Sequence, residues 1–156
     1  MSAIVKYPNR ILKSRCSPVT IVGEEEKEIL QKMAKTMYLN RGVGLAAPQL
    51  GIRKQLAVVD IGDNKLTKLI NPVVVESEGT ETMEEGCLSI PNVYIKIKRA
   101  KRIKVKSFDE NGREFNLEAA DLLARAILHE IDHLKGRLII DYINPIKRFL
   151  ILRKNT

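Results

Sequence analysis

The chain has 156 residues, with 27 lysines and arginines against 19 aspartates and glutamates, which gives a formal net charge of +8. With 44% hydrophobic and 29% charged residues, the composition is that of a globular protein and excludes disordered, collagen-like and disulfide-scaffold classes. We therefore expect a single domain over residues 1–156. A core of this size folds without a metal, so any metal site would point to function first.

The apolar runs and cysteines of the chain bear on its location. No apolar run approaches the roughly 20 residues of a membrane-spanning helix, and the opening residues 1–8 lack the pattern of a secretory signal. The two cysteines, Cys16 and Cys87, lack the spacing of a disulfide framework. We expect a reducing, cytoplasmic location, with a single Cys16–Cys87 bridge as the alternative.

The first predicted element is a helix over residues 24–40. Three glutamates suit its N-terminus, apolar residues recur every three or four positions, and Gly42 ends it. Next comes the sequence Gly-Val-Gly-Leu-Ala-Ala-Pro-Gln at 42–49. Its small residues permit close backbone approach, which favours either a tight turn or a substrate cradle with Gln49 as an amide donor.

The middle of the chain predicts strands. Apolar residues form runs or alternate with polar ones in five segments: 56–59, 66–75, 93–97, 103–106 and 114–117. The sequence Asp-Glu-Asn-Gly at 109–112 predicts a hairpin turn between the last two.

Helical spacing returns over residues 118–135, which Gly136 ends, and a last short helix is expected over 145–153. The only two histidines, His129 and His133, lie four residues apart on the longer helix, with Glu130 between them. Because four residues make about one turn, both imidazoles face one side and could bind one metal beside Glu130 as a general base. The alternative is two core histidines with other partners, but a metal explains two inward imidazoles more easily.

A catalytic metal site typically has three protein ligands, so a third must be found. Downstream of His133 the chain has no His, Cys or Glu, and Ile139 stands where a longer protease motif has its third histidine. Upstream, Cys87 follows a glycine in Glu-Gly-Cys-Leu-Ser, where small neighbours allow close approach. Cys87 is the predicted third ligand, and a small buried hydrophobe is its alternative.

These three segments together resemble the motifs of the peptide deformylases: Gly-x-Gly-Leu-Ala-Ala-Pro-Gln at 42–49, Glu-Gly-Cys-Leu-Ser at 85–89 and His-Glu-x-Asp-His at 129–133. The similarity extends to Tyr-Pro-Asn at 7–9 and so covers nearly the whole chain. One departure is Leu128, because the family commonly has glutamine before the first histidine. We therefore expect the contacts that orient the metal ligands to differ from those in the family.

The resemblance implies a metal-dependent hydrolase that removes the formyl group from the N-terminal formylmethionine of newly synthesised proteins and releases formate. It implies one divalent metal per chain, usually Fe²⁺ and replaceable by Ni²⁺, Co²⁺ or Zn²⁺, on Cys87, His129 and His133. It also implies that Glu130 moves the proton. The expected fold is α+β, with mainly antiparallel strands packed around a central helix that carries the His-Glu-x-x-His motif.

The same resemblance implies roles in substrate binding. The Gln49 side chain and the Leu88 backbone N–H would hold the oxyanion, and backbone around three residues would pair with the substrate as an added strand: Val43, Gly44 and Gly86. The methionine side chain needs an apolar pocket. Candidates by their position near the ligands are Val43, Leu122 and Ala126.

Basic residues are concentrated between Lys96 and Lys106, where seven of eleven positions are Lys or Arg. Their alternation with Val and Ile favours the solvated face of a strand pair. The alternative is contact with ribosomal RNA, to which basic residues near the C-terminus could add: Lys147, Arg148, Arg153 and Lys154.

Two rival functions stay open at this point. The first is a metallopeptidase of the broader His-Glu-x-x-His kind, which Cys87 and the missing downstream ligand disfavour. The second is a noncatalytic basic RNA-binding module. Stoichiometric metal and turnover that depends on Glu130 would exclude it. We expect no membrane and no DNA partner.

Overall fold

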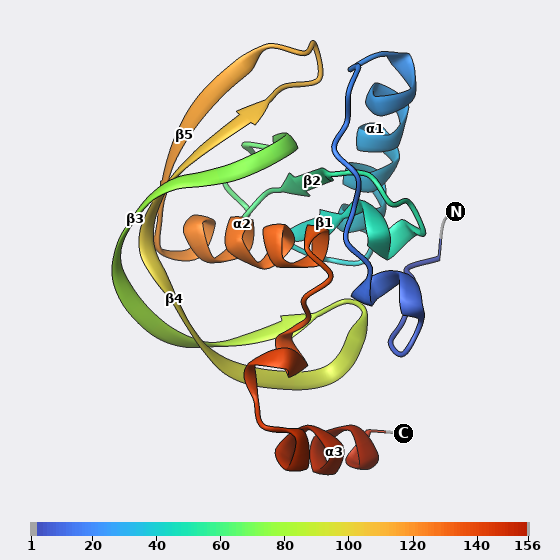
Figure 1. The fold of residues 1–156 in the computed structure, drawn as a ribbon, viewed down its shortest axis with the longest axis vertical. Coiled ribbons are helices and arrows are strands. Elements are labelled where there is room, and N and C mark those ends of the chain that lie inside the picture. Colours follow the sequence, from blue (N-terminus) through green and yellow to red (C-terminus); the bar gives the residue numbers. More distant parts are fainter. Residues whose placement is uncertain (1–2, 156) are drawn as a thin grey trace.

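The computed structural model describes residues 3–155 and has an α+β architecture with one antiparallel sheet (Figure 1). The strands pair in chain order: β1 (Gly44–Ala46), β2 (Leu56–Val59), β3 (Thr67–Cys87), β4 (Ile90–Phe108) and β5 (Glu114–Ala120). The helices are α1 (Glu24–Leu39), α2 (Asp121–Leu134) and α3 (Pro145–Lys154), with short 3₁₀ helices η1 (Arg10–Lys13), η2 (Ala47–Leu50) and η3 (Ile139–Tyr142). Met1 and Ser2, which entered the prediction of location, and Thr156 lie outside the described residues.

The predicted helices are confirmed, with one shifted boundary. The helix expected over 24–40 is α1, and the helix expected over 145–153 is α3. The helix expected from residue 118 begins at Asp121, because residues 118–120 still pair with β4 as part of β5. The apolar pattern of residues 118–120 could not distinguish strand from helix, since so short a segment is compatible with both.

The two long strands of the sheet differ most from prediction. The segments expected over 66–75, 93–97 and 103–106 belong to just two strands, because the polar stretch after residue 75 continues β3 and pairs with β4. Strand β1 was not predicted at all. Its three residues were interpreted only as a turn or cradle, yet they pair with β2 from Gly44↔Val59 to Ala46↔Ala57. Strand pairing supplies hydrogen bonds that so short a segment cannot signal in its own sequence.

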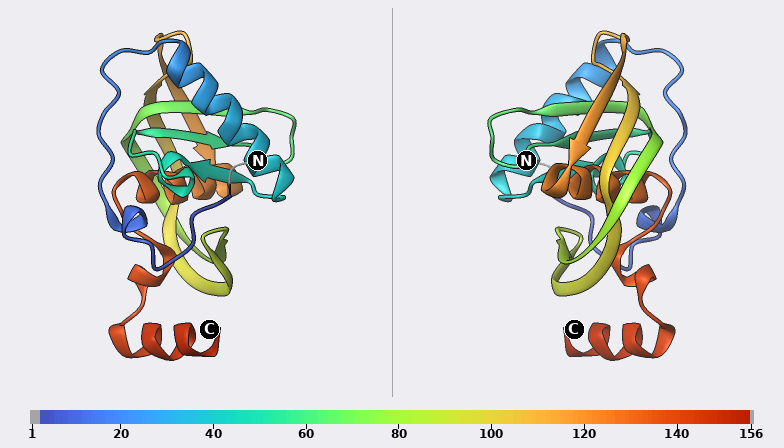
Figure 2. Two further views of the ribbon diagram at one scale, coloured as in Figure 1. Left: turned by 90° about the vertical axis from the view of Figure 1, so that its right-hand side faces the viewer. Right: turned by 90° about the vertical axis from the view of Figure 1, so that its left-hand side faces the viewer.

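Helix α2 contacts β1, β2, β4 and β5. Its buried Ile127 and Ile131 belong to one apolar cluster with Leu69 of β3, and the partly buried Leu128 packs against this cluster. In Figure 1 the long strands curve past this helix, and Figure 2 shows α1 on the side of β1 and β2. Helix α1 packs there through its own apolar stripe: Leu30, Met33 and Met37.

Helix α3 lies at the C-terminal end of the molecule (Figure 2), where the partly buried Ile151 and Leu152 pack against an apolar cluster that includes Ile139. None of its described residues is buried, and Ile146, Phe149 and Leu150 are exposed. Across residues 3–155, every helix is too short or too polar to cross a lipid bilayer.

The basic stretch of β4 faces glutamates that are distant in sequence. The register places Glu76 opposite Lys104, and the same pattern continues along the ladder: Glu78↔Arg102, Glu81↔Arg99 and Glu84↔Lys96. Directly opposed residues of antiparallel strands share a face of the sheet, so the positive charge is largely balanced there. The arrangement favours the interpretation of the basic stretch as the solvated face of a strand pair, rather than as an RNA-binding surface.

The alternative disulfide between Cys16 and Cys87 is wrong. Both cysteines are free thiols, and Cys16 is buried in the apolar cluster beneath α2. Burial raises the pKa of the Cys16 thiol to about 11, against a smaller opposing effect of Arg53, so this cysteine is a neutral core residue.

Candidate metal centre

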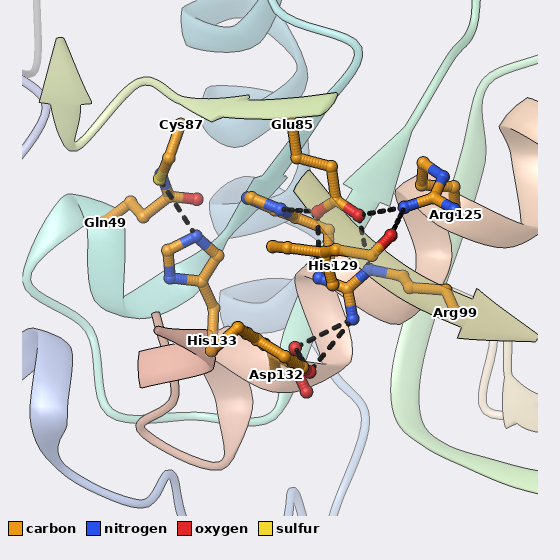
Figure 3. A network of polar contacts seen from close by, with 10 residues as sticks. Gln49, Glu85, Cys87, Arg99, Arg125, His129, Asp132 and His133 are labelled. Atoms are coloured by element: carbon orange, nitrogen blue, oxygen red, sulfur yellow. Dashed lines mark hydrogen bonds and ion pairs between the residues drawn. The ribbon is translucent and has the colours of Figure 1, made fainter. Parts of the chain in front are cut away.

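Helix α2 and the end of strand β3 bring three ligand-type side chains together (Figure 3). The helix holds His129 and His133 one turn apart, with ring centroids 5.0 Å from each other. Cys87 is the last residue of β3, and its Sγ lies 3.3 Å from His133 Nε2. The donor atoms of the three residues all lie within 4.8 Å of one another. The structure therefore brings together the three predicted ligands.

This donor set fits a divalent transition metal. His129 Nδ1 lies 3.0 Å from Glu85 Oε1, which leaves Nε2 as the nitrogen available to a metal. Burial raises the pKa of Cys87, but His133 and His129 outweigh that effect and hold the pKa well below its ordinary value. The thiolate is the form that binds metals. One thiolate with two imidazoles is a donor set that suits iron, cobalt, nickel or zinc.

Glu130 lies beside these residues with a free oxygen. Its side chain is buried, and no group among residues 3–155 hydrogen-bonds its Oε2. Burial raises the pKa of Glu130, although the neighbouring His129 and His133 oppose the rise. A Cβ added at Gly44 would lie 2.4 Å from Glu130 Oε1, so only glycine at this position leaves room for the carboxylate. A buried carboxylate with a raised pKa is suited to accept and return a proton.

Gln49 is held in one orientation on η2. Its Oε1 accepts the Ala46 N–H at 2.9 Å, and its Nε2 donates to Ser89 Oγ at 3.1 Å. Nε2 also lies 3.9 Å from Cys87 Sγ. The amide therefore presents its N–H₂ toward Cys87, and an oxyanion donor requires an N–H held next to the metal ligands in this way.

A cavity of about 480 Å³ opens beside the three ligands. Its lining includes all seven residues predicted for oxyanion or substrate binding: Val43, Gly44, Gln49, Gly86, Leu88, Leu122 and Ala126. Leu122, a predicted candidate for the methionine pocket, lines the cavity, but 45% of its surface is exposed. Leu128 is not among the lining residues, so its replacement of the family's glutamine falls on the apolar core side of α2.

Sequence reasoning missed the charged residues that surround His129. Glu85 is buried and accepts bonds from Arg99 Nε at 2.6 Å, Arg99 Nη2 at 2.8 Å and Arg125 Nη1 at 2.6 Å. Burial would raise the pKa of Glu85, but His129 and Arg99 overcome it and lower the pKa to about 2. The only available signal was the position of Glu85 two residues before Cys87.

This network continues beyond Glu85 to the C-terminal end of α2. Arg99 Nη1 donates to Asp132 Oδ2 at 2.9 Å, and the Tyr142 hydroxyl donates to the same oxygen at 2.5 Å. The guanidinium of Arg137 lies over the Tyr142 ring, 3.9 Å from its centroid. Strand β4, helix α2 and η3 are thus tied together next to the ligands.

The polypeptide deformylase family model matches residues 1–149. A peptide deformylase of Thermodesulfovibrio yellowstonii is 45% identical over 155 residues, which cover 97% of this chain and 94% of the relative. One of Thermoanaerobacter pseudethanolicus is 50% identical, with 87% and 85% covered. The crystal structure of a peptide deformylase from Legionella pneumophila superposes with a TM-score of 0.92 at 39% identity, covering 97% of this chain and 90% of that one.

The activity of these enzymes is removal of the formyl group from the N-terminus of newly made peptides, which confirms the function that the motifs implied. The α+β fold with its five-stranded antiparallel sheet matches their solved structures. With a family model matched over nearly the whole length and relatives at 45% and 50% identity, the chain belongs to the polypeptide deformylase family.

Proposed function

We propose that this chain hydrolyses the formyl amide of N-formylmethionyl peptides at one divalent metal held by Cys87, His129 and His133. The observation that carries this proposal is the convergence of three donor atoms within 4.8 Å, next to a buried carboxylate. The metal is Fe²⁺, with Ni²⁺, Co²⁺ or Zn²⁺ able to substitute. When bound, it would lower the pKa of water from about 15.7 toward 7 and polarise the formyl carbonyl.

Glu130 moves the proton in this reaction. Its unpartnered Oε2 accepts a proton from the attacking water, and the raised pKa of the carboxyl keeps that proton available for the departing amine. The Gly44 backbone leaves the space in which Glu130 can do this. The free amine and formate are the products.

The residues that line the cavity orient the substrate. The Gln49 amide and the Leu88 N–H hold the oxyanion, and backbone around Val43, Gly44 and Gly86 pairs with the peptide. Lys6 Nζ donates to the Leu88 carbonyl at 2.6 Å, which steadies the hairpin turn that carries that N–H. The methionine side chain occupies the apolar part of the cavity, lined by Val43, Leu122 and Ala126.

The domain, location and partners of the enzyme belong to the same proposal. Residues 1–156 act as a single catalytic domain in the cytoplasm, with α2 as the central helix that the antiparallel strands enclose; its contacts with four of the five strands support this. Contact with the ribosome would use the basic residues of α3, a helix at the C-terminal end of the molecule (Figure 2), because those of β4 face glutamates. Those α3 residues are Lys147, Arg148, Arg153 and Lys154.

The test is formate release from a formyl-Met peptide by anaerobically iron- or nickel-loaded protein, with the metal content of every sample measured. Glu130→Ala should retain stoichiometric metal and lose nearly all turnover, because the proton acceptor is gone. Gln49→Ala should also keep its metal and lose about 10²–10³-fold in kcat, the typical effect of removing one oxyanion donor.

Near-normal turnover by Glu130→Ala would refute its assignment as the base. A fully metallated wild-type protein that released no formate would refute the proposed reaction and favour the binding-module alternative. Cleavage of unformylated peptides would favour the metallopeptidase alternative instead.

A further inference from the structure

Arg125 is a buried arginine in the wall of the cavity, one helical turn before His129 on α2. Its guanidinium turns toward Glu85: Nη1 lies 2.6 Å from Glu85 Oε2 (Figure 3). Glu85 in turn bonds His129 Nδ1 through its other oxygen, Oε1. Two residues of one helix, separated by one turn, therefore hold the two oxygens of a single carboxylate from a neighbouring strand.

The other contacts of Arg125 fix it to the two long strands. Nη1 also donates to the Ile97 carbonyl of β4 at 2.9 Å, and Nη2 donates to the Glu81 carbonyl of β3 at 2.7 Å. These bonds offset much of the cost of burying a guanidinium, which is high unless its donors are satisfied. They also leave the guanidinium little freedom to move relative to the strands.

Charge neutralisation alone does not account for a second arginine at Glu85. Arg99 already donates two bonds to this carboxylate through Nε and Nη2. Arg99 is shared, however, because its Nη1 also bonds Asp132 and the Tyr142 hydroxyl. Arg125 is the partner of Glu85 that comes from the same helix as His129.

We propose that Arg125 is a positioning residue for the metal centre: it locks Glu85 in the place where Glu85 orients the imidazole of His129 through Nδ1. The proposal rests on the proposed function, in which His129 binds the metal. Carboxylate partners of metal-ligating histidines fix the ring orientation, and their loss typically costs about 10–100-fold in metal affinity. Arg125 acts one contact further away, so its removal should cost about 10-fold, the lower end of that range.

The experiment uses the full chain with Co²⁺ as the probe metal, because Co²⁺ bound to a thiolate and imidazoles has a visible absorption spectrum. Arg125→Met keeps the length of the side chain and removes its donors, whereas Arg125→Lys keeps one charge. Arg137→Met is the matched control: it makes the same change at an arginine stacked on Tyr142 that makes no contact with Glu85 in the described network. Thermal unfolding of every variant establishes that it is folded.

Three measurements are compared. Co²⁺ affinity by chelator competition should fall about 10-fold in Arg125→Met, less in Arg125→Lys, and not at all in Arg137→Met. The Co²⁺ spectrum should change in the same order. In zinc-loaded protein, the Nδ1 proton of His129 should exchange faster with water in Arg125→Met, and the presence of only two histidines makes its signal easy to assign.

A double variant separates positioning from a direct role. If Arg125 acts through Glu85, adding Arg125→Met to Glu85→Gln should cause no further loss of Co²⁺ affinity. If Arg125→Met lowers Co²⁺ affinity equally in wild-type and Glu85→Gln protein, the inference is overturned. It is also overturned if Arg125→Met lowers the unfolding temperature but leaves Co²⁺ affinity and the spectrum unchanged. If wild-type protein binds no stoichiometric Co²⁺ through a thiolate, the proposed metal site itself fails, and that result is distinct from either of these.

Discussion

Strands β3 and β4 carry glutamates opposite lysines and arginines along their length, but two parts of this ladder have different roles. Away from the metal ligands, Lys104 Nζ and Glu76 Oε1 lie 3.7 Å apart, with 36% of the lysine side chain and 72% of the glutamate side chain exposed. Near the metal ligands, Glu85 and Arg99 are about 95% buried and 2.6 Å apart. Each pair joins a glutamate to a basic residue, a lysine in the first and an arginine in the second, but the first pair is solvated and the second is buried.

The difference shows that burial, not pairing, decides what these charges do. Exposed ion pairs are screened by water and contribute little to stability. A buried charge is costly to leave alone, so every partner of Glu85 matters, and the cluster is rigid enough to orient a metal ligand. Three changes, in order of decreasing expected effect, test this comparison.

Glu85→Ala should have the largest effect. It leaves the buried guanidinium groups of Arg99 and Arg125 without their carboxylate, and removal of one partner of a buried ion pair typically costs about 3–5 kcal/mol of unfolding free energy. Urea unfolding of metal-free protein measures this loss without a contribution from metal binding. Glu84→Ala, one residue away and exposed, is the control. A loss below about 1 kcal/mol would mean that the buried cluster behaves like the exposed pairs.

Asp132→Ala should have an intermediate effect. The Asp132 side chain is 16% exposed and accepts bonds from Arg99 and the Tyr142 hydroxyl. Hydrogen bonds to charged groups contribute about 1.5–3 kcal/mol, and this is the expected loss of unfolding free energy. Tyr142→Phe removes only one of these two bonds and should cost about 1.5 kcal/mol, the lower end of that range. If the two variants lost the same unfolding free energy, the bond from Arg99 to Asp132 would contribute nothing to stability, contrary to expectation.

Lys104→Gln should have the smallest effect, between about 0 and 1 kcal/mol, because its partner Glu76 stays hydrated when left alone. Urea unfolding at low and high salt measures it. The small difference from wild type should shrink further at high salt, since salt screens exposed charges. A loss comparable to that of Glu85→Ala would show that this part of the ladder is not solvated as the structure indicates.

Local features of the fold were predictable because they depend on near neighbours. The helix over 24–40 followed from spacing that a helix itself imposes, and its observed range is Glu24–Leu39. The three short apolar segments of β3 and β4 were also recognised. Their union into two long strands was not, because the polar residues between them become strand only when a partner satisfies their backbone groups.

The candidate site divides in the same way. Sequence alone predicted that His129 and His133 share one face of a helix with Glu130 beside them, since four residues make about one turn. It also suggested Cys87 as the third ligand and Gln49 as an amide donor, and the motif resemblance implied the same two residues. Only the tertiary structure decided that Glu85, Arg99 and Arg125 meet behind His129. Their meeting depends on strand register and on how α2 packs against the sheet, and neither leaves a local pattern in the chain. Tertiary structure also decided that the basic stretch of β4 is balanced, because pairing with β3 places glutamates beside lysines that are far away in sequence.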